Sequence, residues 1–164
     1  MNKPLLTPFD QALQQKNILY FQGKELIQQS YAKYLADESR IEPEIPQRIL
    51  FPQSPQEVSI IVHAAAQHRE DLTISGARTG ISGGAVNLVA RNLLSVEKLW
   101  VPPELDYEEQ TDRWFIKVGV GMTLDQLEQC LLKKTYQAKK TSPVPLFYPV
   151  DPTEKSASIG GTIA

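Results

Sequence analysis

The apolar residues between Val58 and His68 recur at the spacing of a helix face, and they are the clearest secondary-structure signal in the chain. The predicted buried face consists of Val58, Ile61, Val62 and Ala65. Ser54, Pro55 and Glu57 stand before it in the order of a capping box, with Ser as N-cap, Pro in the first helical position and Glu in the third. A helix is therefore predicted from Pro55 to about His68.

Short apolar runs predict strands before and after this helix. The expected strands cover residues 48–51, 72–75, 92–96, 105–110, 114–120 and 147–150. The first two strands and the helix between them form a β-α-β unit, which is the best-defined unit in the sequence.

Further helices are predicted at both ends of this unit, over residues 8–19, over 24–35 and from 124 onward. The last of them begins with a capping box of Thr123 and Gln126. Its predicted buried stripe consists of Leu124, Leu127 and Leu131. Residues 37–46 are charged and contain prolines, so we expect an exposed connection there.

Four of the nine glycines fall between Gly76 and Gly84, directly after the predicted strand 72–75. Each glycine costs stability, because it loses the most backbone freedom on folding. Such a density is typical of a loop whose backbone N–H groups surround an anion. From composition alone, a long turn without a ligand explains the glycines equally well.

Length and composition limit the class of protein. A chain of 164 residues with 41% hydrophobic and 22% charged residues suits one globular domain. A net charge of −2 gives no overall attraction to nucleic acid or anionic lipid. Cys130 is the only cysteine, which excludes an internal disulfide and fits a reducing compartment. With no signal-peptide or transmembrane pattern, we expect a cytoplasmic protein, either free or peripheral to a membrane.

Two glycine patterns resemble known nucleotide-binding motifs, but each lacks residues that the motif requires. Gly119 and Gly121 resemble the start of a dinucleotide fingerprint, yet Leu124 occupies the third glycine position. The loop at 76–84 lacks the Gly-Lys-Ser/Thr ending of a phosphate-binding P-loop.

The remaining candidate residues favour ordinary structural roles. The lysine-rich run at 133–140 is expected to be a solvated face rather than a nucleic-acid site. Cys130 is expected to be a small core residue. His63 and His68 fall off the apolar face of their helix, so we expect them to face solvent, and no metal-ligand cluster stands out.

Six segments match the motifs of one family in the same order. They are the "Y-x-x-D-x-S" run at 34–39, the segment at 48–58, the glycine loop at 76–84, the strand-to-helix step at 118–127, and the segments at 148–152 and 158–164. Together they make the chain similar to the FAD-linked oxidases of the vanillyl-alcohol oxidase and p-cresol methylhydroxylase (PCMH) type. That family includes D-lactate dehydrogenases and glycolate oxidase subunits.

This resemblance implies an α+β fold, the N-terminal part of a PCMH-type FAD-binding domain with a β-α-β subdomain and the start of a second one. A helical segment and connection would occupy residues 1–45, and the FAD-binding domain, incomplete at its C-terminus, residues 46–164. FAD would lie between the subdomains with its diphosphate on backbone amides. The implied cofactor-binding residues are Gly76, Ala77, Arg78, Thr79, Gly80, Gly83, Pro149, Asp151, Ser156, Ser158, Gly160 and Gly161.

Arg78 decides how the flavin is expected to be attached. Some relatives bind FAD covalently through a His in the first loop, where this chain has Arg78. We therefore expect non-covalent FAD. An inward Arg78 would offset the diphosphate charge, and an exposed position at the loop tip is an equally good expectation.

By resemblance, the closest branch oxidises 2-hydroxy acids such as D-lactate, glycolate or 2-hydroxyglutarate by hydride transfer to flavin. The catalytic base of such enzymes would lie beyond residue 164, so no catalytic residue is assigned. The 164-residue chain is expected to be inactive without a C-terminal part or a partner chain.

Two alternatives stay open. In the first, the chain is a truncated module without catalytic activity that binds a nucleotide or another protein. An open sheet edge near 160–164 would then favour self-association. The reductase that makes the peptidoglycan sugar precursor shares the flavin fold, although the segment at 148–152 fits the hydroxy-acid branch better.

Overall fold

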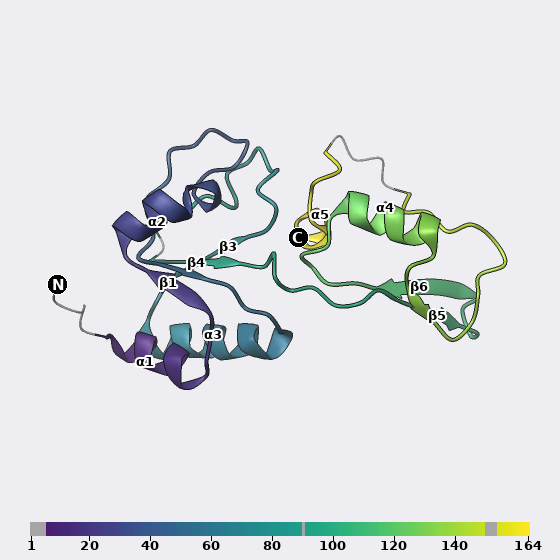
Figure 1. Cartoon of the computed structure of the whole chain (residues 1–164), viewed down its shortest axis with the longest axis horizontal. Coiled ribbons are helices and arrows are strands. Elements are labelled where there is room, and N and C mark those ends of the chain that lie inside the picture. The colour runs from purple at the N-terminus through teal and green to yellow at the C-terminus, as the bar shows by residue number, and fades with distance from the viewer. Residues whose placement is uncertain (1–5, 90, 150–153) are drawn as a thin grey trace.

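A computed structural model describes residues 6–89, 91–149 and 154–164, which form two lobes that each contain one sheet (Figure 1). The strands of the first lobe are β1 (Tyr20–Gln22), β2 (Arg48–Leu50), β3 (Leu72–Ser75) and β4 (Asn92–Ser95). Their order in the sheet is β1-β2-β4-β3. β1 is antiparallel to β2, and the other three strands are parallel to one another. The mixture of helices and sheets agrees with the predicted α+β class.

Helices cover both faces of this first sheet. They are α1 (Pro8–Gln15), α2 (Lys24–Ser30), the 3₁₀ turn η1 (Ala32–Tyr34) and α3 (Pro55–His68). On one face, α1 and α3 pack Phe9, Leu13 and Ile61 against Leu50 and Leu94. On the other face, α2 and η1 pack against the neighbouring strand residues, since side chains alternate along a strand. The predicted helix over 24–35 is therefore split, with a regular α-helix only to Ser30.

α3 confirms the predicted β-α-β unit with two changes in detail. Ser54 Oγ accepts a hydrogen bond from the backbone N–H of Glu57 at 3.2 Å. The Glu57 carboxylate, however, accepts from the N–H of Gln53 at 2.9 Å, so the capping box is only half formed. The buried residues of α3 are Ile61, Ala64 and Ala65, whereas Val62 is exposed and was wrongly placed in the apolar face.

A buried ion pair joins α1 to the sheet. Arg48, only 1% exposed, donates to Asp10 through Nε at 2.5 Å and Nη2 at 3.1 Å. It also donates to Asn92 Oδ1 and to Thr7 Oγ1. Burial alone would raise the pKa of Asp10, but the hydrogen bonds from Arg48 and Thr7 hold it below its usual value. The carboxylate therefore stays ionised inside the first lobe.

The second lobe packs α4 (Leu124–Lys133) on a three-stranded sheet. The strands are β5 (Glu104–Glu108), β6 (Arg113–Lys117) and β7 (Gln137–Ala138), in the order β6-β5-β7, and the short helix α5 (Ile159–Ile163) adds Ile159 to the same core. The Thr123–Gln126 capping box is present, and its predicted stripe is buried with Met122 and Ile159.

Two predictions for the C-terminal region are wrong. Residues 147–149 form no strand, and residue 150 lies outside the described residues. Residues 159–163 form a helix, so the predicted open sheet edge near 160–164 is absent. Among the residues that the structure describes, no helix has the length and apolar character needed to cross a bilayer.

Candidate functional site

A cavity of about 460 Å³ lies where the two lobes meet. One wall is the loop that follows β3, and the opposite wall is the segment that contains α5. Asp37 and Arg78 are the charged residues in the lining, and most of the rest are Gly, Ala, Ser and Thr. The volume lies within the range of ligand sites. The junction of the lobes is therefore the candidate binding site.

The structure brings together most of the residues predicted from the sequence. Those that line this cavity are Gly76, Ala77, Arg78, Thr79, Gly80, Ser158, Gly160 and Gly161. Ser156 lines an adjoining cavity of about 250 Å³, which shares Gly76, Ala77, Arg78 and Ser158 with the first. Pro149 is exposed and belongs to neither lining, and Asp151 lies outside the described residues.

Gly83 is placed differently, against the N-terminal segment. Its φ of +77° is one that glycine adopts freely. A β-carbon at this position would also lie 2.5 Å from Ile41 Cδ1. Gly83 therefore lets the far end of the loop pack closely on Ile41.

The loop wall contains backbone N–H groups that have no partner among the described residues. Within the described part of the chain, the N–H groups of residues 77–80 have no hydrogen-bond acceptor. Ordinary pairing ends just before them, where Ser75 O accepts from the N–H of Val96 at 2.9 Å. Residues 77–79 are half-buried and Gly80 is exposed, and buried backbone N–H groups usually have a partner in the protein, in water or in a ligand. A row of such donors fits a bound anion.

In the opposite wall, the backbone N–H groups of the two glycines are already hydrogen-bonded within the protein. The N–H of Gly160 donates to Val120 O at 3.0 Å, and that of Gly161 donates to Ser158 Oγ at 3.3 Å. A β-carbon at Gly160 would lie 3.0 Å from Val120 Cβ. Gly160 therefore permits close packing of α5 on Val120, which precedes α4.

Arg78 is turned back onto its own loop. Its Nη1 donates to Gly76 O at 2.8 Å, and its guanidinium carbon lies 4.7 Å from the centre of the Tyr34 ring. Nη2 is 3.9 Å from Glu97 Oε2, and the side chain is 15% exposed. Arg78 is thus not an exposed residue at a loop tip, and its charge faces the Glu97 carboxylate.

Tyr34 and Glu97 complete this group, and the sequence assigned neither of them to the site. The Tyr34 hydroxyl donates to Glu97 Oε1. Burial, followed by this hydrogen bond, raises the pKa of Tyr34, so the hydroxyl remains a donor. Tyr34 lies in the "Y-x-x-D-x-S" run, which marked the segment without indicating its role, whereas nothing in the sequence marked Glu97.

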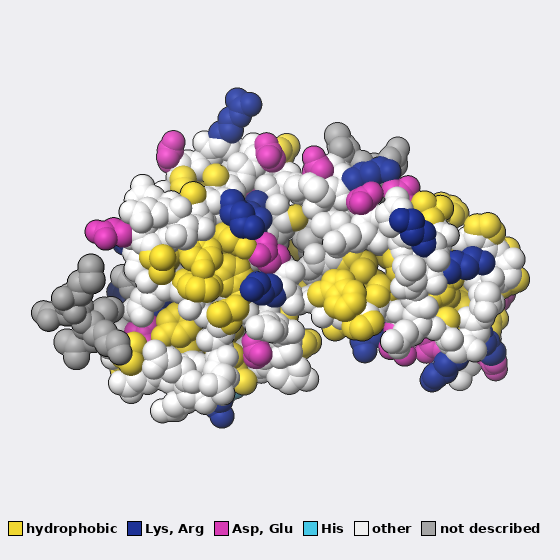
Figure 2. Space-filling view, in the orientation of Figure 1, with side chains coloured by type: hydrophobic (Ala, Val, Ile, Leu, Met, Phe, Trp, Pro, Cys, Tyr) yellow, Lys and Arg dark blue, Asp and Glu magenta, His cyan; other side chains and the backbone are white. Residues whose placement is uncertain are grey.

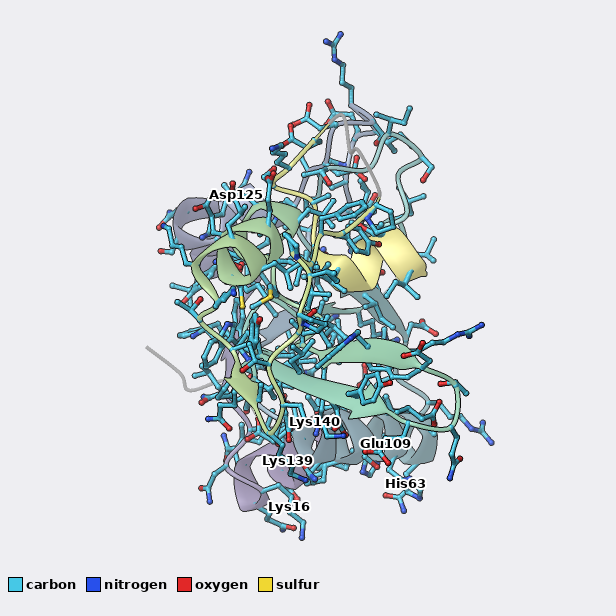
Figure 3. All side chains as sticks on the ribbon, turned by 90° about the vertical axis from the view of Figure 1, so that its right-hand side faces the viewer. Lys16, His63, Glu109, Asp125, Lys139 and Lys140 are labelled. Atoms are coloured by element: carbon cyan, nitrogen blue, oxygen red, sulfur yellow. The ribbon has the colours of Figure 1, made fainter. Side chains whose placement is uncertain are left out.

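The other candidates have the expected structural roles. Cys130 lies on the buried side of α4. Both histidines are exposed on α3, and Figure 3 shows His63. The lysines of 133–140 are exposed, and Lys140 pairs with Glu109 (Figure 3). Acidic and basic side chains intermingle on the face shown in Figure 2. The described residues bring no three potential metal ligands together.

Comparisons with known proteins identify the domain. Residues 46–164 match a family profile described as an FAD binding domain. The chain is 32% identical over 119 residues to a D-lactate dehydrogenase of Anaerostipes hadrus, a match that covers 73% of this chain and 22% of that protein. It is 33% identical over 120 residues to a D-2-hydroxyglutarate dehydrogenase of Xanthomonas citri pv. viticola, with the same two coverages of 73% and 22%. The chain thus spans about a fifth of the length of these curated relatives.

A solved structure supports the fold. Cholesterol oxidase from B. sterolicum superposes with a TM-score of 0.67 at 18% identity, over 100% of this chain and 26% of that one. At this identity the comparison shows a shared fold only.

Proposed function

The chain belongs to the FAD-binding domain family of flavin-dependent oxidoreductases, and from that membership we propose that the cavity between its lobes holds the diphosphate of FAD. The unpaired N–H groups of residues 77–80 carry this proposal. Backbone dipoles suit a diphosphate, because they are held in place without ordering long side chains. Thr79 adds a hydroxyl to the same wall.

The remaining predicted residues form the rest of the proposed site. Ser158, Gly160 and Gly161 supply the opposite wall, and Ser156 lies beside it. Gly83 supports the loop through its contact with Ile41. Pro149 and Asp151 enter the proposal through the resemblance of residues 148–152 to a flavin-contacting segment.

Attachment of the flavin is proposed to be non-covalent. The cavity lining contains neither His nor Cys among the described residues. Both histidines lie on the exposed side of α3, and Cys130 lies in the core of the second lobe.

For the whole protein we propose oxidation of a 2-hydroxy acid. The relatives are named for D-lactate and D-2-hydroxyglutarate, which share that chemical class. Bound FAD supplies the hydride acceptor, while the protein binds and orients the reactants. Because the chain spans about a fifth of those relatives, we propose that the substrate-binding residues belong to a C-terminal part or a partner chain. The 164 residues alone are then inactive.

The domain division and the cellular location also remain proposals. We place the FAD-binding domain at 46–164 and a helical segment at 1–45, although β1 and α1 of that segment complete the sheet and core of the first lobe. We propose a cytoplasmic location, either free or peripheral to a membrane, because a single cysteine fits a reducing compartment.

Titration of the purified chain with FAD, FMN, riboflavin and ADP tests the cofactor site. Binding through the diphosphate predicts quenching of FAD fluorescence at one site and competition by ADP. FMN and riboflavin are expected to bind at least about tenfold more weakly. Equal binding of riboflavin would reject the diphosphate assignment. Absence of FAD binding both here and in a longer polypeptide would reject the site itself.

A further inference from the structure

Three side chains from separate parts of the chain meet beside the cavity. Tyr34 comes from η1, Arg78 from the loop after β3, and Glu97 from the residues after β4. Tyr34 precedes residue 46, so it lies outside the segment that the family profile matches. The contact therefore joins the N-terminal segment to the proposed cofactor loop.

Arg78 needs such support because its backbone is unusual. Its φ of +63° lies in the left-handed region, which disfavours residues other than glycine. The side chain is held by Gly76 O at 2.8 Å and by the Tyr34 ring at 4.7 Å. These contacts keep the residue in place in the middle of the row of unpaired amides.

The same N-terminal segment contacts the other end of the loop. A β-carbon at Gly83 would lie 2.5 Å from Ile41 Cδ1 and 3.5 Å from Ser39 Oγ. Asp37, from the stretch between Tyr34 and Ser39, lines the cavity itself. Residues 34–41 thus touch the loop near its start and near its end.

We propose that Tyr34 and Glu97 are positioning residues, which clamp Arg78 so that the N–H groups of residues 77–80 stay directed at the ligand. Arg78 acts through this clamp and does not contact the phosphate. The clamp is expected to hold the loop in the free protein, without any ligand. Only the expected change in FAD affinity rests on the proposed function.

Tyr34→Phe is the central test, because it removes the hydroxyl and leaves the ring under Arg78. Tyr31→Phe is the matched control, since Tyr31 packs on the same aromatic cluster and its hydroxyl makes no hydrogen bond to the described residues. Equal melting temperatures confirm that both variants fold.

The first readout needs no flavin. Trypsin cleaves after Arg and Lys, so the rate of cleavage after Arg78 reports opening of the loop. Cleavage after the exposed Lys139 in the same sample is the internal reference. Tyr34→Phe is expected to raise the relative rate at Arg78 about tenfold, because it removes a hydrogen bond to a charged group. Tyr31→Phe is expected to change it less than about twofold.

The second readout is the FAD dissociation constant measured at several salt concentrations. Tyr34→Phe and Arg78→Met are each expected to weaken binding about fivefold or more, with the salt dependence of wild type. A flatter salt dependence in Arg78→Met would assign the Arg78 charge to the phosphate and overturn the clamp.

The two readouts separate this inference from the proposed function. An unchanged cleavage rate in Tyr34→Phe overturns the clamp, whether or not FAD binds. Faster cleavage supports the clamp even where the wild-type chain fails to bind FAD, a result that counts only against the cofactor assignment.

Discussion

Gly76 and Ser158 meet so closely across the junction of the lobes that a β-carbon at Gly76 would lie 2.7 Å from Ser158 Oγ. The same oxygen accepts a hydrogen bond from the N–H of Gly161 and caps α5. Both residues line both cavities. Any side chain at residue 76 would therefore force the Ser158 hydroxyl to move.

Gly76→Ala is expected to weaken FAD binding about tenfold, because the added methyl displaces the Ser158 hydroxyl from its capping position. Fluorescence titration measures the effect. Gly80→Ala is the matched control, since Gly80 lines the same wall but its β-carbon would meet nothing within 4 Å. Equal losses in the two variants would show that the contact with Ser158 has no part in binding.

Gly121 makes an equally close contact, with backbone instead of a side chain. Its β-carbon would lie 2.7 Å from the carbonyl oxygens of both Val96 and Glu97. Gly121→Ala is therefore expected to destabilise the protein by about 2 kcal/mol, the usual cost of overpacking. Denaturant unfolding measures it.

Gly84→Ala is the control for that prediction, because its nearest neighbour would be Ser82 Oγ at 3.9 Å. A change within about 0.5 kcal/mol is expected there. A stable Gly121→Ala protein would contradict the packing role. It would also reopen the question of why Gly119 and Gly121 imitate a nucleotide fingerprint.

The elements with local signals could be predicted from the sequence. Thr123 and Gln126 correctly marked the start of α4, and Ser54 marked that of α3. β7 was missed because its two residues, Gln137 and Ala138, form a strand only through parallel pairing with β5. The stretch that was wrongly predicted as a strand contains Pro149 and follows Pro145, and proline removes the N–H that a ladder needs.

The candidate site was predictable only in part. The glycine density allowed an anion loop, and the family resemblance paired it with Ser158, Gly160 and Gly161, which line the same cavity. The contact of Tyr34 with Glu97 and Arg78 had no such signal, because it depends on how η1 packs over the end of the sheet. Contacts between residues so far apart leave no spacing pattern in one sequence.

The N-terminal segment is predicted to be essential for folding. Phe9 and Leu13 are fully buried in the core of the first lobe, and β1 covers the edge of β2. A chain that begins at residue 46 loses both, and burying each large apolar side chain contributes about 2–3 kcal/mol of a stability that is itself about 5–15 kcal/mol. We expect no cooperative transition in its thermal unfolding by circular dichroism.

Leu26→Ala in the full chain is the comparison for that truncation, because Leu26 belongs to the same segment but is 43% exposed. It should keep a sharp transition. A sharp transition in the truncated chain would show instead that residues 46–164 fold alone.

Asp10 is predicted to make stability depend on acidic pH. Its pKa in the folded state lies below the ordinary value of 3.8, because hydrogen bonds from Arg48 and Thr7 outweigh the effect of burial. The ionised carboxylate therefore stabilises the fold above the unfolded pKa, and this contribution is lost as pH falls through the folded pKa. Urea unfolding of wild type should show a free energy that decreases between about pH 5 and pH 2.

Asp10→Asn should cost about 3 kcal/mol at neutral pH, because it leaves the Arg48 guanidinium buried without its close counter-charge. Glu70 then supplies the nearest carboxylate, at 3.7 Å from Arg48 Nη1. The variant should also lose part of the acidic pH dependence. Glu109→Gln breaks the exposed pair with Lys140 and should leave stability nearly unchanged, because water screens that pair. If the two variants unfold alike, the Asp10–Arg48 pair does not hold α1 to the sheet.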